Sequence, residues 1–352
     1  MIKVLIVDDS IVVQRLLTRE LGKFPDIQVV GAAVDPYVAR ERIVELTPDV
    51  ITLDIEMPRM DGLTFLEKLM KHMPMRVIVV SSLSQEGSET ALRALALGAI
   101  DVVGKPSSQF SVPDVAGKLV TAIRAAAAAK LRPIAAAAAR SPIKGAASSG
   151  LRTTGRVLCI GSSTGGTRAL EDILPAFPAD GPATVIVQHM PSDFTGPFAR
   201  RLDGLCSMTV REARDGDPVV QGSILVAPGG RHTTVVRNGA HYQIKIEDSG
   251  PVQHHRPSVD VLFQSAAKCA GANAMGMLLT GMGSDGARGL GALRMAGART
   301  VAQDEASSVV WGMPRVAIEM GAAEAVLGLD RMSEAALKWW RSGRIDESRA
   351  SA

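Results

Sequence analysis

Short apolar runs alternate with longer amphipathic stretches along the first third of the chain. Up to about residue 125 the apolar runs predict five strands, at residues 4–7, 29–34, 50–53, 77–80 and 101–103. The stretches between them, such as 11–23 and 62–72, have apolar residues at helical spacing and predict amphipathic helices. This alternation is typical of a doubly wound parallel sheet with helices on both faces.

The same alternation resumes in the second half of the chain. Further strands are predicted at residues 157–160, 184–188, 224–226, 275–279 and 300–302. Two more extended runs, 233–236 and 241–246, flank Asn238-Gly239, a dipeptide that favours the tight turn of a β-hairpin. The pattern therefore predicts a second α/β domain that contains an antiparallel hairpin insertion.

A different composition separates these two parts. Residues 126–154 contain two alanine-rich runs mixed with proline, glycine, serine and basic residues, and they contain no acidic residue. The first alanines are expected to extend the preceding helix, because alanine is the best helix former. The remainder predicts a semi-flexible linker, with a functional basic tether as the alternative. The expected domains are 1–125 and 155–345.

The overall composition excludes several classes of protein. Hydrophobic residues make up 46% and charged residues 21% of the 352 residues, which fits folded globular domains rather than a disordered chain. The formal net charge of +3 gives no support to a nucleic-acid-binding surface. Cys159, Cys206 and Cys269 lack the spacing of a disulfide framework or a zinc site, and Cys159 is expected to be buried. Without a leader or a long apolar run, a cytoplasmic protein with no direct membrane insertion is expected.

Polar residues follow four of the first five predicted strands. Asp8 and Asp9 follow the first strand, Asp54 the third, Ser81 the fourth and Lys105 the fifth. The carboxyl ends of parallel strands meet at one edge of the sheet, so these side chains are expected to lie close together. Crowded carboxylates require a cation, and hard oxygen ligands suit Mg²⁺. The sequence predicts phosphoryl transfer to Asp54, with the phosphoryl oxygens bound by the lysine and the serine.

A second group of polar residues follows strands of the second domain. Residues 161–165 form the pattern G-x-S-x-G between a strand and a helix, which exposes the hydroxyl of Ser163 as a nucleophile. His189 ends the next strand and is the expected base, and Asp285 follows a third strand and is expected to orient the imidazole. Backbone N–H groups around Met282 are available for an oxyanion. Ser162 and Thr164, on either side of the nucleophile, complete the expected site loop.

Other interpretations of the second domain remain open. Residues 281–286 also match G-x-G-x-x-G, and acidic residues follow about 20 positions later, as in dinucleotide-binding proteins. However, Asp285 would then repel the pyrophosphate, and Ser163 and His189 would have no role. The sequence 254–256, His-His-Arg, is interpreted equally well as a substrate contact or as an exposed turn. Trp339 and Trp340 are expected to pack a terminal helix.

These motifs resemble two known families. The acidic cluster, together with 57–62, resembles the response-regulator receiver over residues 1 to about 125. Across both domains the chain resembles the chemotaxis protein-glutamate methylesterases, the CheB family. The matching segments of the second domain are Ile160–Thr167, Gln188–Pro191, Arg256–Phe263, Leu279–Ala287 and Trp311–Pro314. The resemblance implies a receiver of flavodoxin-like fold, followed by a Rossmann-like methylesterase domain.

The resemblance also implies partners and roles. A chemotaxis histidine kinase would phosphorylate Asp54, with Mg²⁺ held by Asp9, Asp54 and the backbone carbonyl of Glu56. The substrates would be glutamate γ-methyl esters on methyl-accepting chemoreceptors, and some relatives also deamidate receptor glutamines. The unphosphorylated receiver would restrain the hydrolase. Two departures are visible: Ser162 replaces a frequent alanine, and Val102 replaces a frequent aromatic switch residue. The alternative is a receiver-controlled module that binds a dinucleotide or a partner without catalysis.

Overall fold

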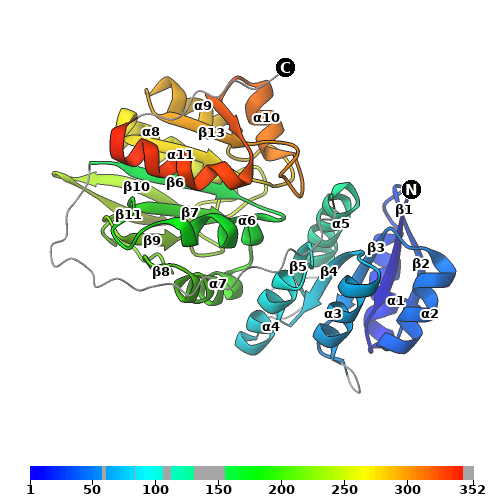
Figure 1. Ribbon diagram of the computed structural model, residues 1–352. Coiled ribbons are helices and arrows are strands. Elements are labelled where there is room, and N and C mark those ends of the chain that lie inside the picture. The colour runs from blue at the N-terminus through cyan, green and yellow to red at the C-terminus, as the bar shows by residue number, and fades with distance from the viewer. Residues whose placement is uncertain (58–60, 83, 106–111, 131–154, 344–352) are drawn as a thin grey trace. The chain divides into compact units, whose positions relative to one another are not determined.

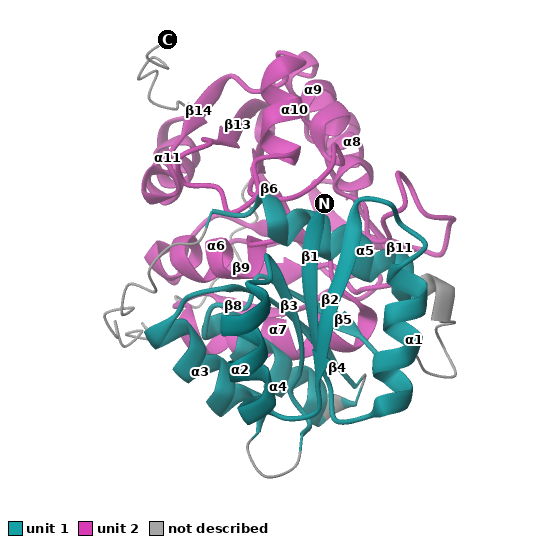
Figure 2. Cartoon of the chain, turned by 90° about the vertical axis from the view of Figure 1, so that its right-hand side faces the viewer, with its two compact units in different colours: residues 1–138 teal, residues 139–352 magenta. Residues whose placement is uncertain are grey.

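The computed structural model describes residues 1–343, apart from 58–60, 83, 106–111 and 131–154. The chain divides into two compact units, residues 1–138 and 139–352 (Figure 2), and each is described by itself below. Their boundary falls inside the segment expected to be a linker, most of which lies outside the described residues. Among the described residues, no helix has both the length and the apolar character needed to cross a bilayer.

The first unit contains a five-stranded sheet in which every pairing is parallel (Figure 1). The strands are β1 (Ile2–Val7), β2 (Ile27–Ala33), β3 (Val50–Asp54), β4 (Arg76–Ser81) and β5 (Asp101–Gly104), in the order β2-β1-β3-β4-β5. The helices are α1 (Ile11–Leu21), α2 (Pro36–Leu46), α3 (Gly62–His72), α4 (Gln85–Ala96) and α5 (Val112–Ala128). This is the flavodoxin-like order, and it confirms the predicted receiver fold.

Capping residues explain where several of these helices begin. The side chains of Ser10, Asp35, Asp61 and Ser84 accept hydrogen bonds from backbone N–H groups in the first turns of α1, α2, α3 and α4. Such caps satisfy donors that have no partner within the helix. Because each cap ends a strand-to-helix loop, the caps also fix the length of the loops that bear the acidic residues.

The second unit contains a seven-stranded sheet in which every pairing is again parallel. In sheet order, its strands are β14 (Ala325–Leu327), β13 (Arg299–Gln303), β12 (Ala274–Leu278), β6 (Val157–Ser162), β7 (Thr184–Gln188), β9 (Ser223–Val226) and β8 (Thr209–Glu212). The edge strands β8 and β14 were not predicted. The predicted hairpin is present as β10 (His232–Asn238) paired with β11 (His241–Glu247).

Helices connect the strands of this unit. They are α6 (Gly166–Ile173), α7 (Ser192–Leu205), α8 (Val259–Cys269), α9 (Ala287–Met295), α10 (Met313–Glu319) and α11 (Leu329–Ser342), with short 3₁₀ turns at Leu174–Ala176 and Gly271–Asn273. Trp339, on α11, is buried, as expected for a packing residue. The doubly wound fold predicted for this domain is confirmed.

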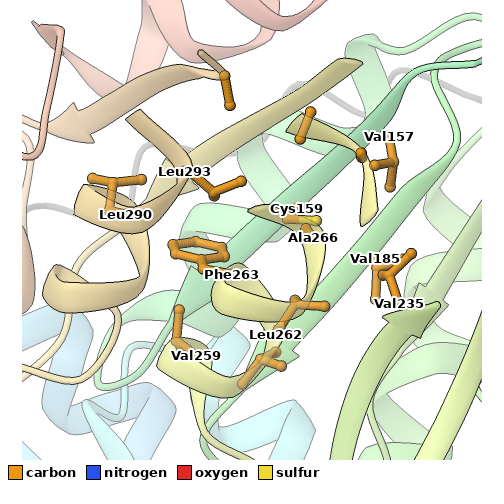
Figure 3. Packing of buried hydrophobic residues seen from close by; sticks show 14 of the residues in the cluster. Val157, Cys159, Val185, Val235, Val259, Leu262, Phe263, Ala266, Leu290 and Leu293 are labelled. Carbon is orange, nitrogen blue, oxygen red and sulfur yellow. The ribbon is translucent and has the colours of Figure 1, made fainter. Parts of the chain in front are cut away.

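Helix α8 lies at the centre of a core that is important for the site. Its residues Val259, Leu262, Phe263 and Ala266 are fully buried and pack with the strands and with α9 (Figure 3). Cys159 of β6 is buried in the same core, as predicted, and burial raises the pKa of its thiol well above the usual range. The core therefore fixes α8, including its N-terminus, against the sheet.

Candidate active site

Ser163 occupies a sharp turn between β6 and α6. Its backbone N–H donates to the carbonyl of Thr280 (3.0 Å), and its carbonyl accepts from Gly166 N–H (2.7 Å). Gly165 has φ of +80°, a conformation that L side chains rarely adopt, and a Cβ there would lie 2.6 Å from the side chain of Val309. The G-x-S-x-G pattern therefore forms the predicted strand–turn–helix elbow.

His189 lies directly beside this turn. Strands β6 and β7 are neighbours, with Ser162 paired to Gln188, so the residues that follow them emerge at the same edge of the sheet. The backbone N–H of His189 donates to the carbonyl of Ser162 (3.0 Å). The Gln188 amide accepts from Ser162 Oγ (2.6 Å) and donates to the carbonyls of Ser163 (2.9 Å) and His189 (3.1 Å). This buried glutamine, which was not predicted, ties the two loops together.

Asp285 reaches the same edge from the loop after β12. Its Oδ2 lies 2.8 Å from His189 Nε2. The carboxylate also accepts hydrogen bonds from Ser258 Oγ (2.8 Å) and from the backbone N–H groups of Val259 (2.7 Å) and Asp260 (3.1 Å). Burial alone would raise the pKa of Asp285, but the bond to His189 and these donors hold it below its usual value. The carboxylate is thus held in its charged form at the N-terminus of α8.

The packing of Val259 fixes that helix terminus. A Cβ on Gly161 would overlap the Val259 side chain, and a Cβ on Gly286 would lie 2.7 Å from it. Two glycines, one at the end of β6 and one after Asp285, thus leave room for a single valine. The N-terminus of α8 is thereby positioned against both loops of the candidate site.

The contact with Asp285 determines the roles of the two imidazole nitrogens. An ionised carboxylate only accepts hydrogen bonds, so Nε2 of a neutral His189 carries the proton and Nδ1 is left as the acceptor. Nδ1 is buried and has no hydrogen-bond partner among the described residues. The His189 side chain is 8% exposed. The ring therefore has one nitrogen fixed and one available to receive a proton.

Met282 offers a donor near the nucleophile. The preceding residue, Gly281, lies so close to Ser163 that a Cβ on it would be 2.7 Å from the serine Cβ. Gly281 N–H is already bonded to the carbonyl of Val310 (3.0 Å), whereas the Met282 N–H has no partner within the described part of the chain. Thr164, from the predicted site loop, accepts from Thr280 Oγ1 through its backbone carbonyl (3.0 Å).

His255 is a further residue at this site. Its ring stacks on that of His189, with centroids 3.8 Å apart and an interplanar angle of 7°. Burial, together with the nearby His189, lowers the pKa of His255 to about 4. From the sequence, His255 could be interpreted equally well as a substrate contact or as part of an exposed turn. Its neighbour His254 is exposed, whereas His255 lies against the expected base.

Ser258 is also at the site and was not predicted. It precedes α8 and caps it by accepting from Val261 N–H (3.4 Å), while donating to Asp285. A serine before an apolar, helix-like run is a recognisable N-cap signal. What the sequence could not reveal is that a buried carboxylate from another loop meets that cap.

The first unit gathers its acidic residues at the ends of β1 and β3. Carboxylate oxygens of Asp8, Asp9 and Asp54 all lie within 4.8 Å of one another. Lys105 Nζ lies 2.6 Å from Asp54 Oδ2 and 3.8 Å from Asp8 Oδ2. Burial of the ammonium would lower the pKa of Lys105, but the bond to Asp54 and the negative charges of Asp54, Asp8 and Glu56 together outweigh burial, so the pKa is raised. The predicted clustering of these four residues is observed.

The donor set fits a hard divalent cation. Asp8 Oδ1 accepts from Ser10 N–H (2.9 Å), but the buried Oδ2 accepts no hydrogen bond among the described residues. Burial raises the pKa of Asp8, and the charges of Asp54 and Asp9 raise it further. A buried carboxylate oxygen that accepts no hydrogen bond from a described residue, and that lies beside two other carboxylates, is in an environment that a magnesium ion would stabilise.

Two other predicted pocket residues make different contacts. The Ser81 hydroxyl lies within hydrogen-bonding distance of the carbonyls of Gly87 (3.2 Å) and Ser82 (3.3 Å). The Glu56 backbone N–H donates to Asp54 Oδ1 (2.9 Å), and its carboxylate accepts from Ser82 Oγ (2.5 Å). Their binding of a phosphoryl group or a metal stays a prediction.

Comparison with known proteins identifies the family. The family model for CheB methylesterase matches residues 158–336, and the model for the response regulator receiver domain matches residues 4–114. The chain belongs to the CheB methylesterase family. A protein-glutamate methylesterase/protein-glutamine glutaminase from Syntrophus aciditrophicus is 50% identical over 95% of this chain and 97% of its own. One from Anaeromyxobacter dehalogenans is 54% identical over 96% and 94%.

A solved structure agrees with this membership. The CheB methylesterase catalytic domain of Thermotoga maritima matches 53% of this chain and 98% of its own, with 36% identity and a TM-score of 0.52. The family resemblance and the hydrolase interpretation are therefore confirmed, and the comparisons do not support the non-catalytic alternative. The glycine-rich turn at 281–286 holds Asp285 against a histidine and a helix N-terminus.

Proposed function

We propose that this chain is a phosphorylation-activated serine hydrolase that removes methyl esters from glutamates of chemoreceptors and also deamidates receptor glutamines. The observation that carries the proposal is the bond between Asp285 and His189 Nε2, which leaves a buried Nδ1 without a hydrogen-bond partner among the described residues, on a histidine whose backbone bonds to Ser162 next to Ser163. The names of the relatives, which specify both glutamate methyl esters and glutamine, support the choice of substrates.

The proposed reaction begins with attack by Ser163. Its Oγ bonds to the ester carbonyl carbon while the hydroxyl proton moves to His189 Nδ1. Asp285 stabilises the resulting imidazolium through Nε2–H. The Met282 N–H donates to the oxyanion, a type of interaction worth about 3–4 kcal/mol in related chemistry.

The intermediate then collapses to an acyl-enzyme. The bond to the methoxy oxygen breaks, and Nδ1–H returns its proton to that oxygen, so that methanol leaves. Water attacks the acyl carbon and gives one proton to Nδ1. The bond to Ser163 Oγ then breaks and Oγ takes that proton, so that Ser163 and neutral His189 are regenerated, and the released glutamic acid loses its remaining proton to solvent. With glutamine the leaving group is ammonia. Direct attack by water without an acyl-enzyme is the alternative, and stoichiometric labelling of Ser163 by a serine-directed phosphonate would argue against it.

In the receiver, we propose that Asp54 accepts a phosphoryl group from a histidine kinase. Asp9, Asp54 and the Glu56 carbonyl would hold Mg²⁺, which when bound neutralises the negative charge that accumulates between carboxylates and phosphate. Lys105, already within 2.6 Å of Asp54, would bind a phosphoryl oxygen in place of the carboxylate, with Ser81 as a further donor.

The test of the hydrolase proposal is methanol release from methylated receptor membranes. Wild type should release methanol, Ser163→Ala should release none above background, and the exposed Ser249→Ala should match wild type. Equal and negligible release by all three proteins would overturn the proposal.

A further inference from the structure

The turn that presents His255 to His189 is strained. Val252 and His255 exchange two backbone hydrogen bonds (3.1 and 2.9 Å) around Gln253 and His254. These two central residues have φ of +48° and +66°, although neither is glycine. A non-glycine residue in the left-handed region is strained by the close approach of its Cβ to the backbone. Two such residues in succession require compensating contacts.

Those contacts come from residues next to Asp285. The Gln253 amide nitrogen donates to Asp260 Oδ2 (2.5 Å), and its carbonyl oxygen accepts from Ser284 Oγ (2.8 Å). Asp260 is itself buried and accepts from Gly289 N–H (2.6 Å). Ser284 immediately precedes Asp285 in the chain, and the Asp260 N–H donates to the Asp285 carboxylate. The strained turn is thus bonded to two residues, Asp260 and Ser284, that adjoin the Asp285 carboxylate.

One hydrogen bond does not fix the plane of an imidazole. With Cβ fixed by the backbone and Nε2 fixed by Asp285, the ring of His189 can still tilt about the line that joins these two atoms, and such a tilt would turn Nδ1 away from Ser163. A second ring stacked nearly parallel at 3.8 Å blocks that tilt.

We infer that His255 is a positioning residue, held by a strained turn, whose stacked ring keeps the His189 Nδ1 directed toward Ser163. The inference rests on the proposed function. Because burial lowers the pKa of His255 to about 4, its ring is neutral near pH 7 and can remain stacked when His189 becomes an imidazolium.

The test compares three variants of the full chain, each activated by the same small-molecule phosphodonor. His255→Ala should lower kcat about 10- to 100-fold, the range expected for a misplaced catalytic group, with KM changed less than about twofold. His255→Phe, which restores a flat neutral ring, should recover most of kcat. His254→Asn, at the exposed neighbouring position, should match wild type, because asparagine tolerates the left-handed conformation.

A second readout uses a small fluorophosphonate that labels Ser163 without contacting receptor-binding surfaces. His255→Ala should slow labelling by the same factor as kcat. Undiminished labelling with weakened receptor hydrolysis would instead make His255 a receptor contact and would overturn the inference. If wild type neither hydrolyses receptors nor is labelled, the proposed function itself fails. If wild type is labelled and His255→Ala is labelled at the same rate, only the positioning role fails.

Discussion

A carboxylate that is 1% exposed, as Asp285 is, keeps its charge only if donors replace the water it has lost. Four groups do so: one imidazole, one hydroxyl and two backbone N–H groups. The two backbone donors belong to the first turn of a helix, where the macrodipole also favours a negative charge. The sequence predicted Asp285 and its histidine partner, whereas the helix whose N-terminus stabilises Asp285 belongs to a different segment of the chain.

Replacing the Asp285 carboxylate by an amide should lower both the stability of the protein and its kcat. In Asp285→Asn, an NH₂ group would face donors that need an acceptor, which should cost about 1–3 kcal/mol of stability. Without an acceptor for Nε2–H, His189 loses its fixed tautomer, and kcat should fall about 10³- to 10⁴-fold, as in other serine hydrolases. Kinetics on methylated receptors and thermal unfolding would measure both effects. Exposed Asp180→Asn is the matched control, and an active Asp285→Asn would contradict the assigned role.

Asp8 and Asp285 have opposite effects on stability as the pH changes. The depressed pKa of Asp285 means that its contribution is present above the unfolded-state value near 3.8 and is lost as the pH falls through the folded-state pKa. The pKa of Asp8 is raised, so the folded state binds its proton more tightly than the unfolded state does. As the pH rises from about 3.8 through the raised pKa, Asp8 therefore costs stability.

Neutralising Asp8 should stabilise the first unit at pH 7 in the absence of divalent ions. We expect Asp8→Asn to raise the free energy of unfolding by on the order of 1 kcal/mol, which corresponds to a rise of about 4 °C in the unfolding temperature of a domain of this size. Mg²⁺ should raise the unfolding temperature of wild type more than that of the variant, because ligand binding to the folded state stabilises it. Calorimetry with and without Mg²⁺ measures this. Asp9→Asn should gain less because Asp9 is exposed, and a destabilised Asp8→Asn without Mg²⁺ would refute the argument.

At the scale of elements, the N-terminus of α8 is the structural centre of the candidate active site. Ser258 caps this terminus, and the Val259 side chain packs against Gly161 and Gly286. Backbone N–H groups of the first turn donate to Asp285. Adding a side chain at Gly161 should therefore impair catalysis by displacing the N-terminus of α8, and not by contact with the catalytic residues.

A double-mutant cycle can test this coupling. Gly161→Ala should displace Val259, loosen the donors of Asp285, cost more than about 1 kcal/mol of stability and lower kcat at least tenfold. Val259→Ala alone should leave a small cavity and a milder defect. The double variant should be more active than Gly161→Ala, because the second change makes room for the added methyl group. Simple additivity of the two defects would rule out this steric coupling.

The elements that the sequence predicted are those with a clear local signal. The buried strands are continuous apolar runs, and Asn238-Gly239 marks the hairpin turn between β10 and β11. The edge strands β8 and β14 were missed because runs of four and three residues are too short to show a period. The turn at 252–255 was not predictable, since Gln253 is not a residue that favours left-handed backbone. Only tertiary contacts with Asp260 and Ser284 explain it.

On the scale of the whole molecule, both units place their chemistry at the carboxyl ends of parallel strands. This common rule is why the residues of both sites could be predicted from their positions after apolar runs. The coupling between the units could not be obtained in this way, because it depends on how phosphorylation of one unit alters the other. The bond between Lys105 and Asp54 gives a starting point: a phosphoryl group on Asp54 must displace that interaction.

Phosphorylation at Asp54 should therefore control hydrolysis by the second unit. With a small-molecule phosphodonor and Mg²⁺, methanol release by wild type should rise about 5- to 150-fold, which corresponds to a coupling of about 1–3 kcal/mol. Asp54→Asn should not respond, whereas the exposed Asp49→Asn should respond like wild type. A fragment lacking residues 1 to about 150 should be active without the phosphodonor, because its restraint has been removed. Identical responses of wild type and Asp54→Asn would place the switch elsewhere, and a folded but inactive fragment would show that the receiver activates rather than restrains.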